Sequence, residues 1–519
     1  MFFTVRSAFR ATGLVLLAAA ALTNVFAQPR GDEPGREARV AQAFKAMRGD
    51  EAALALWLRQ MPKGADLHNH LVGAVYAENL LRWAAEDGLC IDPQAGAIVA
   101  AAQCKPPLLA AREAQRSPQL HEQMLQSLSM RDFKGFDRRG AVAGHAQFFA
   151  TFDRFQQAAT QRDADMLAEV AERAAANGVR YLELMHSPGM LEAAFGAPED
   201  LGGDWAAQWQ RDQDRLEGIA QKVVSQMDEA HARMRQLLAC DSPAQARPGC
   251  GVQIRLLGQV IRVFPAHQVF AQSSLAFMLA RRDARFVGVN LVAPEHSPVT
   301  QRDYGVQMHQ LGWLKSRWPE VPVSLHAGEL TWGLVPPEQL RSNIRQAIEV
   351  AGAQRIGHGV SIAHEDDAQA LLDQMARQGI AVEINLTSND VILGVRGARH
   401  PLHLYLRAGV PTVLSTDDEG VSRIDLTHEY LRAMTEQGLG YRQLKRMARN
   451  SLIYAFVPGQ SLWRVPQPGA AQQRVKPCVR LGSAACSGWL RGNAKAQLQR
   501  QLEADFTRFE QALLTSGYR

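Results

Sequence analysis

Four segments of the chain place histidines or carboxylates where a short apolar run ends. They are Asp66-Leu67-His68-Asn69-His70, Ser324-Leu325-His326-Ala327-Gly328-Glu329, Arg355-Ile356-Gly357-His358-Gly359 and Leu414-Ser415-Thr416-Asp417-Asp418. Alternate residues of an extended chain point to the same side, so His68 and His70 can face one ligand together. Three histidines with one carboxylate form a good zinc set, and nitrogen and oxygen ligands without thiolate suit a hydrolytic metal. The segments therefore predict a metal site, provided that one fold brings them together.

Each segment taken alone also has a structural explanation. His326 fits a hydrogen-bonded core histidine, and Glu329 fits a charge at the start of a helix. Asp417 and Asp418 fit a capping pair before the next helix. Only their convergence in space would favour the metal site over these explanations.

Eight short apolar runs alternate with amphipathic segments and are the expected strands. They are Gly64 to Leu67, Val179 to Leu184, Gln253 to Val263, Phe286 to Val292, Pro322 to Leu325, Ile356 to Gly357, Ile380 to Asn385 and Thr412 to Ser415. Eight such units predict an α/β fold of the (β/α)₈ TIM barrel type. The four segments then follow strands one, five, six and eight, at the face where barrel active sites lie.

The rest of the chain is expected to surround this barrel. We assign residues 28–60 to an N-terminal helical extension, 61–458 to the barrel with insertions at 86–140 and 195–250, and 459–519 to a Pro/Gly-rich loop and a C-terminal helix. The six cysteines fall in these segments as three local couples, Cys90 with Cys104, Cys240 with Cys250 and Cys478 with Cys486. Six cysteines allow 15 pairings, so this disulfide pattern is a hypothesis from proximity.

Residues 1–27 have the pattern of a signal peptide. Arg6 and Arg10 precede an apolar run from about Gly13 to Ala21, and Val25-Phe26-Ala27 is an acceptable cleavage site. This pattern predicts a secreted or periplasmic protein that is cleaved after about Ala27. A retained anchor is the alternative, but the run is shorter than the roughly 20 residues that span a bilayer.

Composition excludes several classes of function. The chain has 519 residues, of which 46% are hydrophobic, as in a folded protein and unlike a disordered one. Its 57 basic and 52 acidic residues give a net charge of only +5. This balance does not suggest binding to nucleic acid or to a membrane surface.

Further short motifs accompany the four segments in order along the chain. They are Tyr181-Leu182-Glu183-Leu184 with Ser187-Pro188, Thr387-Ser388-Asn389 and His400-Pro401. With them, the sequence from about Met61 to Pro458 resembles the adenosine deaminase family of metal-dependent, amidohydrolase-like barrels. Export and a cysteine-bearing insertion after the first strand are similar to the secreted, growth-factor type branch of that family.

The resemblance implies one Zn²⁺ ion per chain and a role for each matched residue. The implied zinc ligands are His68, His70, His326 and Asp417. A metal-activated water would attack the purine carbon that bears the amino group, and ammonia would leave. His358 would orient this water and accept or stabilise its proton, Glu329 would protonate the neighbouring ring nitrogen, and Asp418 would hold the other ring nitrogen.

The substrate side is less closely matched. Phe148, Phe149 and Phe152 resemble the apolar wall over the family's substrate, and Trp332 is a candidate lid. The family commonly has aspartate at the position of Val72, where it contacts the ribose, and glycine at the position of Ala293, whose N–H could still meet a purine nitrogen. We therefore expect adenosine or deoxyadenosine as the substrate, and keep adenine and modified adenosines as alternatives.

Two other hypotheses stay open at this stage. The barrel could hydrolyse an amide or ester of another small molecule, although Glu329, His358 and Asp418 suit a purine ring. The chain could also be an extracellular nucleoside-binding or signalling protein with weak catalysis. The cytidine-type signature of His-x-Glu with Pro-Cys-x-x-Cys is absent from the sequence. The expected partner is a small purine nucleoside, and the N-terminal helices and insertions leave a homodimer open.

Overall fold

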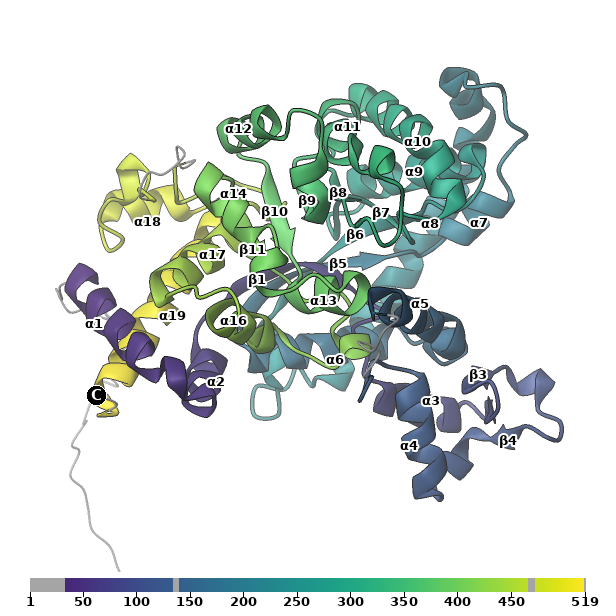
Figure 1. The fold of residues 1–519 in the computed structure, drawn as a ribbon, viewed down its shortest axis with the longest axis horizontal. Coiled ribbons are helices and arrows are strands. Elements are labelled where there is room, and N and C mark those ends of the chain that lie inside the picture. Colours follow the sequence, from purple (N-terminus) through teal and green to yellow (C-terminus); the bar gives the residue numbers. More distant parts are fainter. Residues whose placement is uncertain (1–32, 134–139, 465–471, 518–519) are drawn as a thin grey trace, which may run out of the picture.

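The computed structural model describes residues 33–133, 140–464 and 472–517, and eight parallel strands form its centre (Figure 1). The strands are β1 (Gly64–His70), β5 (Val179–His186), β6 (Gln253–Ile261), β7 (Phe286–Val292), β8 (Ser324–Ala327), β9 (Arg355–His358), β10 (Ala381–Ile384) and β11 (Thr412–Leu414). Each one lies within or overlaps one of the eight expected segments. Because β1 continues to His70, both of its histidines belong to the strand itself.

Two four-stranded sheets join into one closed barrel. Their strand orders are β1-β5-β6-β7 and β8-β9-β10-β11, with parallel pairing throughout. Parallel bridges from Asn69 to Asp417 and from Val289 to Val323 connect the two sheets at both seams. Most of these strand residues are buried on both faces, as in parallel sheets covered by helices. The expected (β/α)₈ barrel is confirmed.

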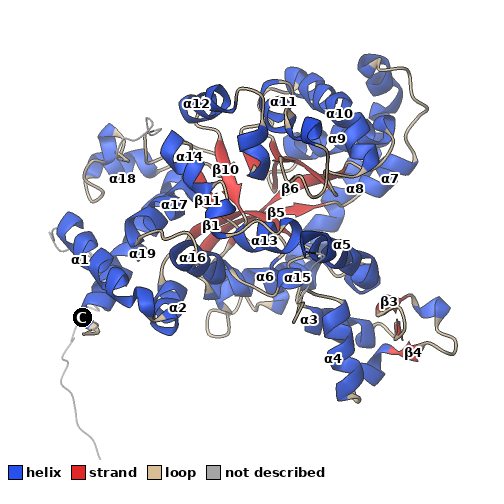
Figure 2. Ribbon diagram, viewed as in Figure 1, coloured by secondary structure: helices blue, strands red, loops and turns tan. Residues whose placement is uncertain are grey.

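Helices surround the barrel and connect its strands (Figure 2). Between β1 and β6 they are α3 (Ala77–Glu86), α4 (Pro118–Ser127), α5 (Gly140–Ala159), α6 (Asp163–Ala176), α7 (Met190–Phe195) and α8 (Trp205–Leu237). From β6 to β11 they are α9 (Ala266–Arg282), α10 (Pro298–Arg317), α11 (Asn343–Glu349), α12 (Ala368–Gln378), α13 (Leu386–Leu393) and α14 (Leu402–Ala408). After β11 follow α15 (Glu419–Ser422), α16 (Leu426–Thr435) and α17 (Tyr441–Ile453).

The cysteine-bearing segments lie outside the strands of the barrel. Residues 90–110 form a small antiparallel sheet in which β2 (Cys90–Asp92) lies between β3 (Ala97–Val99) and β4 (Leu109–Ala110). The disulfide Cys90–Cys104 closes this sheet, Cys240–Cys250 follows α8, and Cys478–Cys486 joins α18 (Ala484–Leu490) to the turn before it. All three expected pairings are present, so no cysteine is left for a metal or a redox site.

The N-terminal extension and the C-terminal helix pack together beside the start of β1. The helices α1 (Glu33–Ala46) and α19 (Ala494–Thr515) contact one another and α17, and α2 (Glu51–Gln60) leads into β1. Lys445 links them, since its Nζ lies 2.6 Å from Glu510 Oε1 and 2.9 Å from Glu37 Oε2. Leu502 lies beside Gly64, so this bundle covers the end of the barrel opposite to the carboxyl ends of the strands.

The expected signal peptide, residues 1–27, lies outside the described residues, as do residues 134–139 of the first insertion. Within the described ranges, no helix combines the length and the hydropathy that crossing a bilayer requires.

Candidate metal centre and active site

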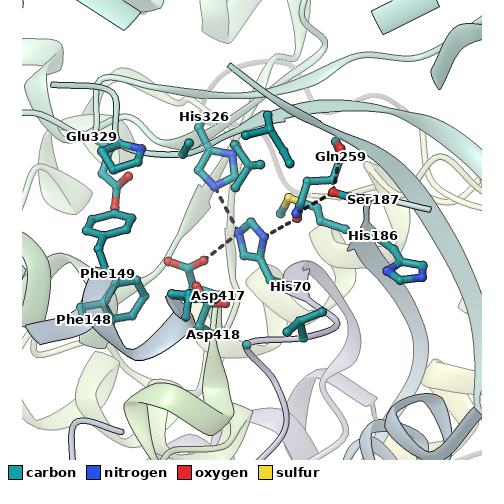
Figure 3. Close-up of a pocket in the computed structure, with 18 of the residues that line it drawn as sticks. His70, Phe148, Phe149, His186, Ser187, Gln259, His326, Glu329, Asp417 and Asp418 are labelled. Atoms are coloured by element: carbon teal, nitrogen blue, oxygen red, sulfur yellow. Dashed lines mark hydrogen bonds and ion pairs between the residues drawn. The ribbon is translucent and has the colours of Figure 1, made fainter. Parts of the chain in front are cut away.

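The carboxyl ends of four strands bring six titratable side chains together at one end of the barrel (Figure 3). These side chains are His68 and His70 of β1, His326 of β8, His358 of β9, and Asp417 and Asp418, which directly follow β11. All six are at most 6% exposed. The four sequence segments therefore converge in space, as a metal site needs. Separate roles as a core histidine, a charge at a helix start and a capping pair do not account for this convergence.

The Nε2 atoms of His68 and His70 face the Asp417 carboxylate, and the ring of His326 lies against both histidines. Asp417 Oδ1 lies 3.1 Å from His70 Nε2 and 3.4 Å from His68 Nε2. The Nε2 atoms of His70 and His326 are only 3.2 Å apart, and the ring centroids of His68 and His326 are 4.5 Å apart. Four potential ligand atoms thus surround one small volume.

The opposite nitrogen of each of these rings faces a side-chain oxygen. His68 Nδ1 lies 2.7 Å from Glu383 Oε2, His70 Nδ1 lies 2.6 Å from Gln259 Oε1, and His326 Nδ1 lies 2.7 Å from Asn290 Oδ1. An oxygen acceptor at Nδ1 holds the ring proton there and leaves a lone pair on Nε2.

Ser187 fixes the orientation of the Gln259 amide. Its hydroxyl donates to the Gln259 backbone carbonyl at 2.8 Å, so its oxygen accepts from Gln259 Nε2 at 3.0 Å. Gln259 Oε1 is therefore the atom that faces His70.

This donor set fits a divalent metal ion. Lone pairs on nitrogens 3.2 Å apart repel each other unless a cation lies between them, and the buried His68 Nε2 has no hydrogen-bond partner in the described protein. Three imidazole nitrogens and one carboxylate oxygen, without thiolate, match the preferences of a catalytic zinc site. The structure brings the four expected zinc ligands together: ligand atoms of His68, His326 and Asp417 lie within 4.8 Å of one another, and His70 Nε2 lies 3.1 Å from Asp417. His358 belongs to the same group of potential ligands.

His358 lies beside this group but has different neighbours. Its Nε2 is 3.8 Å from Asp417 Oδ2, and its Nδ1 is 2.9 Å from Asn389 Nδ2. Burial lowers the pKa of His358 to about 3, so its ring is neutral at neutral pH. Its Nδ1 thus faces an amide nitrogen, whereas the other three rings face oxygens.

Glu329 lies in the loop after β8, where a second buried carboxylate fixes its backbone. Its N–H donates to Glu295 Oε2 at 2.8 Å, and the Gly328 N–H donates to Glu295 Oε1 at 3.0 Å. Burial, and then the carboxylates of Asp417 and Glu295, raise the pKa of Glu329 well above its usual range. A carboxyl group with a raised pKa is protonated at neutral pH and can act as a general acid.

Asp418 is held against the turn that follows β1. Burial and the neighbouring Asp417 carboxylate raise the pKa of Asp418 to about 8, against the opposing effect of His70. Asp418 Oδ1 lies so close to Gly73 that a Cβ at residue 73 would be 1.6 Å away. A protonated Asp418 can therefore donate a hydrogen bond from this wall of the site.

A buried chain of charges supports His68 from within the barrel. Arg355 donates to Glu383 Oε1 and to Glu183 Oε2, each at 2.6 Å, and all three side chains are at most 1% exposed. Burial alone would raise the pKa of Glu383, but Arg355 and His68 lower it to about 2. Glu383 therefore stays ionised and keeps its bond to His68 Nδ1.

Sequence reasoning missed these supporting residues. Glu183 and Glu383 are the single acids of two largely buried strands, and Arg355 begins another buried strand. A charge on a buried strand needs a charged partner, so these positions carried a detectable signal. Gln259 and Asn290 gave no comparable signal, because polar amides are common at strand ends.

Three residues around the site have left-handed backbone conformations without being glycine. They are Ala293 with φ 87°, His358 with φ 67° and Asp417 with φ 62°. Buried Arg262 holds the first of them, since its Nε donates to the Ala293 carbonyl at 2.8 Å and its Nη1 to the His326 carbonyl at 3.1 Å. Such strained backbone persists where the surroundings hold it in place.

A cavity of about 630 Å³ opens over the candidate metal group. The residues expected at the substrate, namely Val72, Phe148, Phe149, Phe152 and Ala293, all line it together with Glu329, His358 and Asp418. Phe148 and Phe149 lie on one side of the histidines and His186 on the other (Figure 3). Trp332 lies outside the cavity wall: it is 67% exposed and contacts the ring of His364, so the structure does not place it as a lid.

Known proteins with similar sequences and folds are deaminases and amidohydrolases. A family model described as adenosine deaminase matches residues 103–464. The adenosine deaminase of Escherichia coli strain SMS-3-5 is 31% identical over 296 residues, which cover 56% of this chain and 72% of that protein. The structure of arabidopsis ADAL complexed with IMP has a TM-score of 0.53 at 20% identity, over 87% of this chain and 99% of that chain. An amidohydrolase of Burkholderia ambifaria with bound Zn has a TM-score of 0.51 at 17% identity, over 88% and 94%.

We expect Gly357→Ala to abolish metal binding while the protein stays folded. A Cβ at residue 357 would lie 2.6 Å from His68 Cε1, and Glu383 holds the His68 ring in place. Metal analysis of the purified variant, with circular dichroism for the fold, measures this. Gly218→Ala is the matched control, because a Cβ there meets nothing within 4 Å and the metal content should not change. Full metal content in Gly357→Ala would contradict the placement of His68.

We expect Ala293→Gly to raise the free energy of unfolding by about 1 kcal/mol, because glycine adopts φ 87° without strain. Urea unfolding of the metal-loaded protein measures the change. Ala232→Gly, at an exposed position inside α8, should lower the same free energy by about 1 kcal/mol. A decrease of the same size in both variants would show that Ala293 is not strained.

Proposed function

Because the chain belongs to the adenosine deaminase family, we propose that it hydrolyses adenosine or deoxyadenosine to the inosine-type product and ammonia. The observation that carries this proposal is the arrangement of three Nε2 atoms and Asp417 beside the raised-pKa carboxyls of Glu329 and Asp418. A hydrolase of simple amides or esters would not need two carboxyl groups that are kept protonated on separate walls of one cavity.

Zn²⁺ is the ion that we propose for the metal centre. The imidazole and carboxylate donors support it, as does the bound Zn in the Burkholderia ambifaria amidohydrolase of similar fold. Bound by His68, His70, His326 and Asp417, such an ion would lower the pKa of a water molecule and supply the nucleophile at neutral pH.

The protein side chains then act on the purine ring. Glu329 donates its proton to the ring nitrogen beside the reacting carbon, which relieves negative charge as that carbon becomes tetrahedral. Asp418, protonated below a pKa of about 8, donates to the ring nitrogen on the opposite edge. Phe149 and Phe152 cover the ring from α5 and exclude water. The backbone N–H of Ala293 is available to a third purine nitrogen at the cavity wall.

The sugar side of the cavity distinguishes among aminopurines. Val72 offers no acceptor to a ribose hydroxyl, and Leu191 on α7 is apolar and 49% exposed at the cavity. Asp153 and Gln156 on α5 are the exposed polar residues there. Among the described residues that line the cavity there is no lysine or arginine to pair with a phosphate. We therefore propose an uncharged nucleoside. Adenine is the alternative that Val72 favours, because adenine has no ribose, and a base-modified adenosine is a further alternative.

We propose a secreted or periplasmic location. The signal-like pattern of residues 1–27 supports it, and so do the three disulfides, because disulfides persist mainly in oxidising compartments.

Incubation of metal-analysed protein with adenosine, deoxyadenosine, adenine and AMP tests the activity, with absorbance and ammonia as readouts. We expect ammonia from the nucleosides and little from AMP.

Glu329→Gln should keep its metal and lose about 10²–10⁴-fold in kcat, because the amide cannot protonate the ring. His68→Ala should lose metal and activity together.

In the unmodified enzyme, kcat/KM should fall as the pH rises through the raised pKa of Glu329, because Glu329 must be protonated to act as the general acid. A metal-loaded protein that deaminates none of the four compounds would refute the proposal.

Expression of the full chain in a Gram-negative host tests the location. We expect the periplasmic fraction to contain a protein whose N-terminus begins near Gln28, as determined by N-terminal sequencing. An intact N-terminus in the cytoplasmic fraction would contradict the proposed export.

A further inference from the structure

Asn389 and His400 form a buried chain of hydrogen bonds that ends on the ring of His358. The backbone N–H of Leu402 lies 3.1 Å from His400 Nδ1. His400 Nε2 lies 2.9 Å from Asn389 Oδ1, and Asn389 Nδ2 lies 2.9 Å from His358 Nδ1. His358, Asn389 and His400 are at most 3% exposed, so solvent does not exchange with these contacts freely.

The backbone amide of Leu402 sets the position of every proton in this chain. A backbone N–H can only donate, so His400 Nδ1 must accept. Burial and the nearby Arg432 lower the pKa of His400 to about 3, which keeps the ring neutral with its single proton on Nε2. That proton is donated to Asn389, so the facing atom of Asn389 is its oxygen, and its amide nitrogen must point at His358. His358 Nδ1 then accepts, and its ring proton is on Nε2.

This places His358 in the tautomer opposite to that of its three neighbours. In His68, His70 and His326 an oxygen holds the proton at Nδ1 and leaves Nε2 free to bind a cation. His358 Nε2 carries a hydrogen, and it has no hydrogen-bond partner in the described protein. The Asn385 amide nitrogen, 3.4 Å from His358 Nδ1, supports the same assignment. Glu329 Oε1 is 3.7 Å from His358 Nδ1, which is too far to take a proton from it.

We propose that Asn389 and His400 are positioning residues that fix His358 as the Nε2–H tautomer. Before the reaction His358 is then neither a metal ligand nor a proton acceptor, but a hydrogen-bond donor aimed at the oxygen that attacks the purine. An N–H aimed where negative charge develops stabilises the transition state without rearranging. The identity of that oxygen rests on the proposed function, whereas the tautomer itself does not.

Nitrogen-15 NMR of histidine-labelled protein tests the tautomer directly. The chemical shifts of Nδ1 and Nε2 differ between the two neutral forms, and the signals of His358 are assigned by their absence from His358→Gln. We expect His358 protonated at Nε2 in both the metal-free and the metal-loaded protein. A proton on Nδ1 in the metal-free protein would overturn the proposal, whatever the activity.

Asn389→Asp tests the consequence for catalysis. Its carboxylate would accept from His358 Nδ1, and the proton would move away from Nε2. We expect one metal ion per chain as before, exchanged shifts for His358, and a loss of about 10²-fold or more in kcat with KM little changed. Unchanged kcat in a variant with the exchanged tautomer would overturn the role of the donor.

Two substitutions of His400 keep the test valid if Asn389→Asp does not fold. His400→Gln retains a donor to Asn389 and should preserve kcat, whereas His400→Leu removes it and should lower kcat. Equal kcat in both would contradict the chain of donors. His403→Gln is the matched control: His403 lies three residues further along, on α14, and its Nε2 bonds to the Gln437 carbonyl at 2.8 Å. This variant should change neither kcat nor the His358 signals. If no aminopurine is deaminated but His358 still carries its proton on Nε2, the proposed function fails and the tautomer assignment stands.

Discussion

Repulsion among buried lone pairs is the constraint on which the rest of the site depends. Three buried imidazoles and a carboxylate face one small volume at the base of the cavity, with two nitrogens 3.2 Å apart. A cation at the centre would relieve this repulsion, and each ring has to be held in place from its opposite side. Hydrogen bonds from the three Nδ1 atoms to Glu383, Gln259 and Asn290 hold the rings in this way. Strand ends, rather than flexible loops, carry the ligands because small displacements would increase the repulsion.

The same principle separates the roles of residues with similar chemistry. Four histidines lie within ring-contact distances of one another, yet an amide nitrogen faces one of them and oxygens face the others. Two adjacent aspartates likewise differ, since Asp417 contacts two imidazoles and stays ionised while Asp418 has a pKa near 8. Hydrogen-bond partners, and not residue type, decide which group binds the metal and which donates a proton.

Much of this architecture could be predicted from sequence. The eight strands, the three disulfides and the convergence of His68, His70, His326 and Asp417 follow from apolar runs, local cysteine spacing and strand-end motifs. The supporting residues could not be predicted in the same way, because Gln259 and Asn290 act through contacts between strands that sequence spacing does not encode. Trp332, a candidate lid from its place beside Glu329 in the sequence, contacts the ring of His364 and does not line the cavity in this structure. Asn389 belonged to a recognised motif, but its orientation depends on a backbone amide 13 positions further along the chain.

The buried charges behind His68, namely Glu383, Arg355 and Glu183, extend the hydrogen bonds of the candidate metal group through the barrel. Arg355 donates to the Tyr454 carbonyl at 2.9 Å, and Glu183 accepts from the Phe456 N–H, so these buried charges reach the segment that leaves α17. The contacts from His68 through Glu383, Arg355 and Glu183 are continuous, and they end on the backbone of residues 454 and 456. The interior of the barrel thus carries an unbroken path of hydrogen bonds from the candidate metal group to the start of the C-terminal region.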